Sequence, residues 1–185
     1  SLDEDYLTRA KAFAYVIEKN PNIIESVTEL QNLATLLDVD ELHVSDSEGL
    51  IAYSSVPKYV GLDFHNGEQM RGFLPILESD DPDEYVIQDA QPNTAEGKIM
   101  KYVGVARKDK KGLVQVGLEP TRLLEAQQRN TYSYIFSRFP TNEGEQLFAI
   151  NKTTNELIAS TNDLDDKEAS YYTYDNLKDC QSGTF

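Results

Sequence analysis

Residues 41–55 read ELHVSDSEGLIAYSS, and this stretch decides the fold. Leu42 and Val44 alternate with polar neighbours such as His43, so apolar and polar side chains point to opposite faces of a predicted strand. A Ser-Glu-Gly turn follows, and residues 50–54 resume the strand pattern. The stretch therefore predicts a β-hairpin with one face towards a core.

The same pattern recurs further along the chain, where residues 146–162 read QLFAINKTTNELIASTN. Each copy follows a predicted helix. We interpret the recurrence as a duplication, in which two modules each begin their sheet with the same hairpin. The matched positions are Leu42 and Leu147, Val44 and Ala149, Asp46 and Asn151, and Leu50-Ile51-Ala52 and Leu157-Ile158-Ala159.

The chain has 185 residues, of which 39% are hydrophobic and 10% aromatic, with a net charge of −15. This composition supports a packed core and argues against disorder. A chain with this much negative charge is not expected to present the clustered Lys and Arg side chains that bind nucleic-acid phosphates or anionic lipid. We therefore expect no nucleic-acid partner. The single Cys180 allows no intrachain disulfide. No run of about 18 apolar residues occurs, so any membrane attachment would have to come from transmembrane helices absent from this fragment.

Two helices are predicted before the first strand. Asn20-Pro21 ends the first, over residues 3–19, because the residue before a proline is disfavoured in the helical region. A second helix is predicted over residues 22–37. The apolar face of the first helix consists of Tyr6, Ala10, Phe13, Ala14 and Ile17.

Beyond the first hairpin, residues 67–78 have a helical pattern. Pro120 suits the first position of a further helix, predicted over residues 120–138. An antiparallel five-stranded sheet packed against helices, of the α+β class, follows from this order. The three predicted strands that complete the sheet are residues 84–89, 99–107 and 113–118.

Three segments carry a resemblance to a known family: VDELHVSDSEGLIAYSSVPKYVGLDF, MRGFLPIL and KYVGVARKDKKGLVQVGLEPTRLLEA. Together they resemble the double Cache sensors, which are tandem PAS-like domains outside the membrane of bacterial receptors. The resemblance implies an N-terminal helical region, a membrane-distal PAS-like sensor module, a connecting helix and the incomplete start of a membrane-proximal module. These divisions are residues 1–38, 39–119, 120–140 and 141–185.

The resemblance also implies a function. It implies that the chain is the extracytoplasmic ligand-sensing domain of a bacterial cell-membrane receptor. This receptor would be a histidine kinase, a diguanylate cyclase or a chemotaxis receptor. A small molecule would bind in the first module, and the N-terminal helix would carry the signal and pair two copies into a homodimer. The alternative is a ligand-free structural or dimerisation module, and the sequence leaves both open.

We expect neither enzymatic activity nor a metal or cofactor. His43 and His65 lack metal-ligand spacing, and no phosphate-binding loop or nucleophile elbow occurs. Ser55 and Lys58 match the S-x-x-K pattern, but Pro57 disfavours the helical turn which that chemistry needs. His43 is therefore expected to be a structural or surface residue.

A PAS-like sheet that curves around a cavity implies ligand contacts from its strands and from the helical segment. Arg71 could hold a carboxylate with two parallel hydrogen bonds, or be a surface charge beside Glu68. The ligand class stays open between a small carboxylate and another metabolite. Some members of the family that bind amino acids carry Arg followed closely by Trp-Tyr, whereas Arg71 precedes Gly72-Phe73 here, which argues against general amino-acid recognition. The predicted ligand contacts are Tyr53, Arg71, Tyr85, Asp89, Tyr102, Arg107 and Gln115.

Overall fold

The computed structural model describes residues 1–161 and 164–178. Residues 162–163 and 179–185, with Cys180 among them, lie outside the described residues. Contacts divide the chain into two compact units, Ser1–Leu123 and Leu124–Phe185. Within the described part, no helix combines the length and the apolar character needed to cross a membrane.

Helix α1, Leu2–Lys19, opens the first unit. Its N-terminus is fixed by Ser1, whose hydroxyl accepts a hydrogen bond from the backbone N–H of Glu4 while the Glu4 side chain accepts one from the backbone of Ser1. The helix ends before Pro21, as predicted. Its buried side chains are also those predicted: Tyr6, Ala10, Phe13, Ala14 and Ile17.

The prediction of one continuous helix over residues 22–37 is wrong. A short 3₁₀ helix covers Pro21–Glu25, and α2 covers Val27–Leu36. Ser26 separates them because its backbone is extended and its hydroxyl accepts a hydrogen bond from the N–H of Glu29, at 3.2 Å. Serine at this position satisfies one of the free N–H groups of the new helix start.

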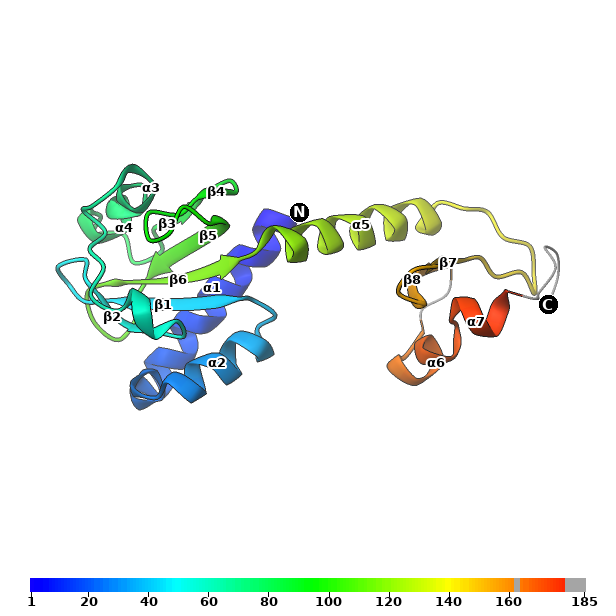
Figure 1. Ribbon diagram of the computed structural model, residues 1–185, viewed down its shortest axis with the longest axis horizontal. Coiled ribbons are helices and arrows are strands. Elements are labelled where there is room, and N and C mark those ends of the chain that lie inside the picture. The colour runs from blue at the N-terminus through cyan, green and yellow to red at the C-terminus, as the bar shows by residue number, and fades with distance from the viewer. Residues whose placement is uncertain (162–163, 179–185) are drawn as a thin grey trace. The chain divides into compact units, whose positions relative to one another are not determined.

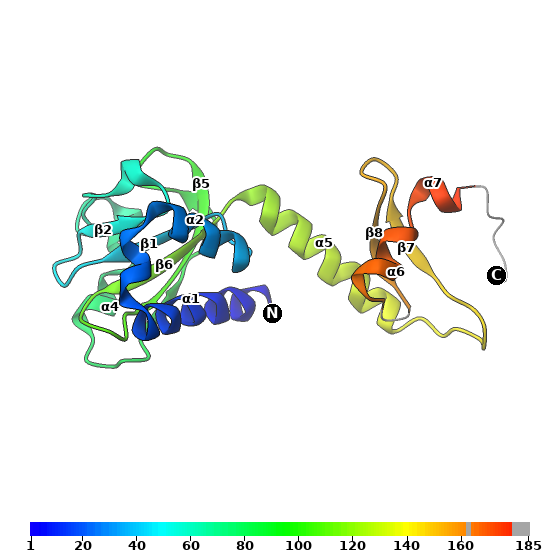
Figure 2. The same cartoon turned by 90° about the horizontal axis from the view of Figure 1, so that it is seen from below.

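The strands form an antiparallel sheet in the order β2-β1-β6-β5-β3, with the short β4 paired to β5. Figure 1 shows α1 and α2 on one side of this sheet and α3 and α4 on the other, and Figure 2 gives the view from below. The predicted α+β architecture, with an N-terminal helix and an antiparallel sheet, is confirmed, although β4 was not predicted. The strands are β1 Glu41–Ser45, β2 Ile51–Ser54, β3 Tyr85–Ile87, β4 Gln91–Pro92, β5 Ile99–Ala106 and β6 Leu113–Leu118.

The sheet separates two apolar clusters. On one face, Leu42 and Val44 of β1 pack with the apolar sides of α1 and α2. On the other face, the segment between β2 and β5 folds back and contributes Phe64 and Phe73 to a second cluster with Met100 of β5. Because side chains alternate along each strand, the sheet contributes apolar side chains to the clusters on both of its faces.

The helical pattern of residues 67–78 forms two short helices, α3 Glu68–Arg71 and α4 Leu74–Glu78. Between them, Phe73 is fully buried against β5. A Cβ atom at Gly104 would lie 2.8 Å from the Cδ1 atom of Phe73, so only glycine lets this ring approach the strand.

Helix α5, Pro120–Ser137, begins at the proline that the sequence predicted. Its start is tied to the first unit by Asp40, whose Oδ2 accepts a hydrogen bond from the N–H of Glu119 at 2.8 Å. The guanidinium of Arg122 donates to both carboxylate oxygens of Asp40, at 3.0 and 3.1 Å, and also pairs with Asp38. This bidentate pair ties the first turn of α5 to the segment that precedes β1.

The second unit contains the predicted second hairpin. Strands β7 and β8 pair antiparallel, and two short helices follow them in the described residues. The duplication itself stays an interpretation. These elements are β7 Phe148–Asn151, β8 Glu156–Ser160, α6 Asp166–Tyr171 and α7 Tyr174–Leu177.

Candidate functional site

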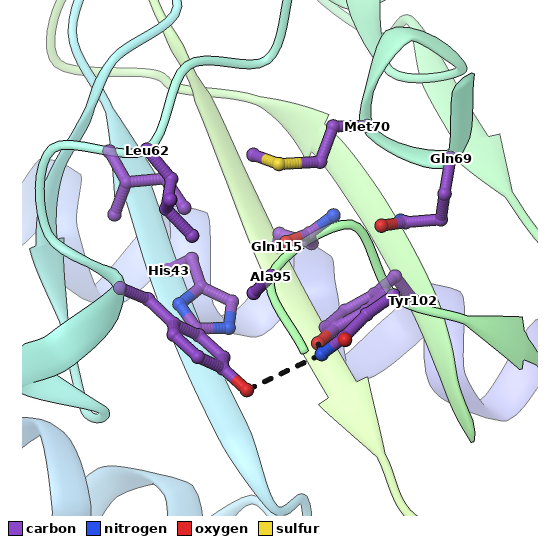
Figure 3. Close-up of a pocket in the computed structure, with 10 residues that line it drawn as sticks. His43, Leu62, Gln69, Met70, Ala95, Tyr102 and Gln115 are labelled. Carbon is purple, nitrogen blue, oxygen red and sulfur yellow. Dashed lines mark hydrogen bonds between the residues drawn. The ribbon is translucent and has the colours of Figure 1, made fainter. Parts of the chain in front are cut away.

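A small cavity lies on the sheet face opposite to α1, beneath the segment that folds back between β2 and β5. Its volume of about 20 Å³ has room for one water molecule. Figure 3 shows His43, Tyr102 and Gln115 on the strand side, with Leu62 and Met70 among the groups around them. The cavity is lined by His43, Ile51, Tyr59, Leu62, Gln69, Met70, Asn93, Ala95, Tyr102 and Gln115.

Strand alternation and register bring the polar wall of the cavity together. In β1, Leu42 points to the helices, so His43 points to the cavity. His43 pairs across the sheet with Gln115 of β6. Gly117 pairs with Tyr102, and a Cβ atom there would lie 2.6 Å from the Tyr102 ring, so the glycine leaves the ring its space.

A buried hydrogen-bond network begins at Ser54. Its Oγ lies 2.8 Å from Nδ1 of His43, and Nε2 of His43 lies 3.0 Å from Oε2 of Glu41. The hydroxyl of Tyr102 donates to the same Glu41 oxygen at 2.8 Å. With a proton on Nε2, His43 donates to Glu41, and its Nδ1 can accept a hydrogen bond from the Ser54 hydroxyl. Burial raises the pKa of Tyr102 far above its usual range, and the charge of Glu41 adds to the rise.

Asn93 extends the network from the sheet into the loop between β4 and β5, residues 93–98, which we call the covering loop. Its Nδ2 donates to the hydroxyls of Tyr102 at 3.2 Å and Tyr59 at 3.4 Å. Its Oδ1 accepts from the backbone N–H groups of Glu96 at 2.9 Å and Lys98 at 3.2 Å. All the polar atoms of this buried amide are thereby used, and the loop is held over the tyrosines.

The network reaches the surface through Tyr59. Its hydroxyl donates to Oε2 of Glu96 at 2.6 Å, and Lys58 forms an ion pair with the other oxygen of Glu96. Burial, and then the hydrogen bond to Glu96, raise the pKa of Tyr59. Lys58, and then Tyr59, lower the pKa of Glu96, so this carboxyl is charged at neutral pH.

The two glutamines of the cavity differ in their partners. Gln69 donates from Nε2 to Gln88 at 3.0 Å, and its Oε1 accepts from the N–H of Thr94 at 3.0 Å. Gln115 is only 3% exposed, yet its amide makes no hydrogen bond to any residue that the structure describes. In that same part of the chain every fully enclosed side-chain nitrogen and oxygen has a partner, so the Gln115 amide faces open space in the cavity.

Of the seven predicted ligand contacts, the structure brings Tyr102 and Gln115 to the cavity and places the other five elsewhere. Tyr53 packs with the helix-side core. A β-bulge after Val44 pairs Tyr53 with that residue, so Tyr53 does not share the face of Ile51 as simple alternation would require.

The remaining four lie outside the cavity for different reasons. Arg71 and Asp89 are exposed at the surface, and Tyr85, on the edge strand β3, is 50% exposed. Arg107 is buried, but its guanidinium donates to Asp109 at 2.9 and 2.8 Å and to the carbonyl oxygen of Ser45 at 2.8 Å. These bonds fix the turn after β5 and leave Arg107 a structural role.

Most groups of this network were not predicted from the sequence, among them Glu41, His43, Tyr59 and Asn93. Glu41 and His43 alternate with Leu42, which is a signal that places both on the face away from the helices. Tyr59 and Asn93 come from loops without periodicity, and no local pattern marks them.

Two specific arrangements, a metal-holding cluster and the S-x-x-K pair, can be compared with the described residues. No group of three or more His, Cys, Asp or Glu side chains in that part of the chain is arranged to hold a metal ion. The Ser55 hydroxyl accepts a hydrogen bond from the N–H of Leu42 at 2.9 Å, whereas Lys58 is paired with Glu96. The two residues of the S-x-x-K match therefore have separate roles: Ser55 holds the end of the β1–β2 hairpin together, and Lys58 forms a surface ion pair with Glu96.

No protein-family model matches the sequence, and no curated protein matches it either. Solved structures with a similar fold include the sensor domain of DcuS from E. coli, at 20% identity and a TM-score of 0.48, covering 70% of this chain and 99% of that domain. The sensory domain of the Campylobacter jejuni chemoreceptor Tlp3 with isoleucine bound has 14% identity and a TM-score of 0.42, covering 86% of this chain and 62% of that one. The ligand-binding domain of the Pseudomonas fluorescens chemoreceptor CtaA with L-isoleucine has 12% identity and a TM-score of 0.44, covering 94% and 65%. The chain thus spans less than two thirds of either chemoreceptor domain.

Proposed function

We propose that the chain is the extracytoplasmic ligand-sensing part of a bacterial membrane receptor, and that its first unit binds a small molecule. The observation that carries this proposal is the cavity between the sheet and the covering loop. A single hydrogen-bond network runs from Ser54 through His43 and Tyr102 to the loop at Asn93. A ligand that enters the cavity would act on both walls at once.

Strand β5 offers a path from the cavity to the N-terminal helix. Tyr102 faces the cavity, while Val103 packs with α1 on the opposite face. Lys101, also buried, forms an ion pair with Asp3 of α1 at 2.7 Å. A ligand that favours one position of β5 would therefore favour one position of α1, by no more than its difference in affinity for the two states.

Homodimerisation through α1 is part of the same proposal. The apolar face of the helix is buried against its own sheet, so a second copy would contact the outer face, where Tyr15 is 61% exposed. We expect Tyr15→Asp to lower the sedimentation coefficient of the chain if α1 pairs two copies. An unchanged coefficient with a dimeric wild type would place the dimer contact elsewhere.

The sensing role can be tested by thermal denaturation of the chain with small carboxylates, amino acids, amines, amides, purines and sugars. A ligand at about 100 times its dissociation constant stabilises by about 2.7 kcal/mol, which is several degrees. Ala95→Leu would fill the cavity from the loop and should abolish the shift. Ala90→Leu, at an exposed position outside the cavity, is the matched control and should keep it.

The ligand-free structural module is a second candidate, and the small volume of the cavity favours it. Ligand cavities usually measure about 300–1,000 Å³, so a ligand has to widen this one. If no compound of the panel raises the Tm of the wild type, the ligand-free module is supported over the sensor.

A further inference from the structure

We propose that the cavity selects a small uncharged ligand, and that the amide of Gln115 reads the hydrogen-bonding edge of this ligand. The inference rests on the proposed role of the first unit as a sensor. It goes further because it names the ligand class and the residue that sets it.

The first reason is the state of Gln115. This residue is 3% exposed and its amide makes no hydrogen bond within the described residues, so a water molecule or a ligand in the cavity has to supply its partners. Gln115 lies in the middle of a central strand, paired across the sheet with His43 and Gly104. A glutamine amide offers both a donor and an acceptor, so it can form two bonds to one planar edge.

The second reason is charge. No Asp, Glu, Lys or Arg is among the residues that line the cavity. The cations closest to it along the network are engaged, since Lys58 pairs with Glu96 and Lys98 pairs with Glu119 at 2.7 Å. An anionic ligand would be buried without a partner and near the carboxylate of Glu41, which is unfavourable.

A cationic ligand is disfavoured as well. Glu41 does not line the cavity, and its Oε2 already accepts hydrogen bonds from His43 and Tyr102. With neither sign of charge offered, an uncharged molecule loses the least on leaving water.

The third reason is the character of the other walls. Ile51, Leu62 and Met70 supply aliphatic surface. The ring of His43 lies 5.6 Å from that of Tyr59 and 6.0 Å from that of Tyr102, between centroids. These walls suit an apolar body with one polar edge, as in a small carboxamide, lactam or urea. Leu62 and Met70 come from outside the sheet, and a methionine side chain adapts readily when such a ligand widens the cavity.

The test uses two sets of probes, each with one carbon skeleton and three charge states. The first set is isobutyramide, isobutyrate and isobutylamine, and the second is nicotinamide, nicotinate and 3-pyridylmethylamine. Each is added at the same millimolar concentration to the full chain, and the Tm is measured for the wild type and for Gln115→Leu. Gln115→Met serves as a second isosteric variant should the first fail to fold.

We expect at least one amide to raise the Tm of the wild type by several degrees, while its acid and amine do not. Gln115→Leu should remove this shift. It should also leave the Tm of the unliganded chain unchanged or higher, because it replaces an unpaired amide by an apolar side chain of similar size. Gln69→Leu is the matched control, and it should lower the Tm since it breaks the bonds to Gln88 and Thr94.

Three outcomes would overturn the inference. If the acid or the amine stabilises and Gln115→Leu abolishes its effect, the sensing role stands but the ligand class is wrong. If the amide still stabilises Gln115→Leu, Gln115 does not read the ligand. If none of the six probes stabilises the wild type, the inference fails, whereas the sensing role is judged separately by the broader panel.

Discussion

The two hairpins of the chain make the same local bonds in different surroundings. In the first, the N–H of Leu42 donates to the Ser55 hydroxyl at 2.9 Å, and in the second, the N–H of Leu147 donates to the Thr161 hydroxyl at 3.1 Å. Both hairpins have a register shift at the equivalent point, between Val44 and Ser45 and between Ala149 and Ile150. Each turn begins with a side chain that accepts two backbone hydrogen bonds, although the donors are Glu48 and Leu50 at Asp46 but Thr153 and Thr154 at Asn151. The registers make Leu157 the counterpart of Ile51, so the predicted match of Ile51 with Ile158 is wrong by one residue.

Their surroundings differ. All five residues of β1 are buried, since β2 and β6 flank the strand and a helix pair covers one face. Among the described residues, β7 pairs only with β8, and its four residues are half-buried. Where the first hairpin has His43, the second has Phe148, whose ring stacks on Tyr172 at 4.3 Å. The recurring sequence pattern thus forms a hairpin in both places, but a cavity also needs the neighbouring strands.

The largest difference should appear when an aromatic side chain is removed from each unit. Phe13 is fully buried in the first unit, so Phe13→Ala should lower its free energy of unfolding by about 3–5 kcal/mol. Phe148→Ala should cost about 1 kcal/mol because its ring is half exposed. Hydrogen exchange of peptides from β5 and β7 measures each unit separately, and equal losses would contradict the contrast.

The next effect concerns Arg107, which donates a hydrogen bond to the carbonyl oxygen of Ser45 in the first hairpin. In the second hairpin, Ile150 occupies the position of Ser45. Arg107→Met leaves the Asp109 carboxylate without its partner and should lower the free energy of unfolding by about 3 kcal/mol. Urea denaturation followed by circular dichroism measures the loss. A loss below about 1 kcal/mol would show that Asp109 finds other partners.

This pair also predicts a pH dependence. Burial raises the pKa of Asp109, but the hydrogen bonds and charge of Arg107 outweigh it, so the net pKa lies below the usual value. A lowered pKa stabilises the fold above the unfolded value of about 3.9, and this stabilisation is lost as the pH falls through the folded value. The difference between wild type and Arg107→Met should therefore be full near pH 7 and shrink below about pH 4.

The hydrogen bonds that Ser55 and Thr161 accept at the ends of the two hairpins should differ less in their contribution to the free energy of unfolding. Ser55→Ala leaves the buried N–H of Leu42 without a partner and should cost about 1–3 kcal/mol. Thr161→Val should cost less than about 0.5 kcal/mol, since Leu147 is 38% exposed and water can replace the hydroxyl. Exchange rates of the Leu42 and Leu147 amides report each site. Equal acceleration of both would show that burial does not distinguish them.

The smallest effect should be the same in both hairpins. Asp46→Ala and Asn151→Ala each remove two exposed hydrogen bonds in a turn and should cost about 0.5–1 kcal/mol. Asp46→Asn is the control that keeps the acceptor, and it should change the free energy of unfolding little. Unequal losses from the two alanine variants, measured by urea denaturation, would mean that the turns are not equivalent.

Local chemistry explains why much of the fold could be read from the sequence. The face of α1 follows from spacing alone, because Tyr6, Phe13 and Ile17 recur with the helical period. The hairpins follow from alternation around Asp46 and Asn151. The single helix over residues 22–37 failed because Ser26 acts as a cap, a role that periodicity does not reveal.

The site was harder to predict because its members meet only in the folded chain. Tyr102 and Gln115 were found because both sit on central strands. Arg71 and Tyr85 were not brought to the cavity, since a position on the right segment does not fix the direction of a side chain.

The sequence by itself determined the elements and their apolar faces, because helix and strand periods act over a few residues. Only the tertiary structure decided which polar groups share the cavity. A bulge turned Tyr53 to the helices, Asp109 held Arg107 in a turn, and Asn93 fastened a loop to two tyrosines. The open amide of Gln115 likewise exists only because the register of three strands and the covering loop enclose it without supplying a partner.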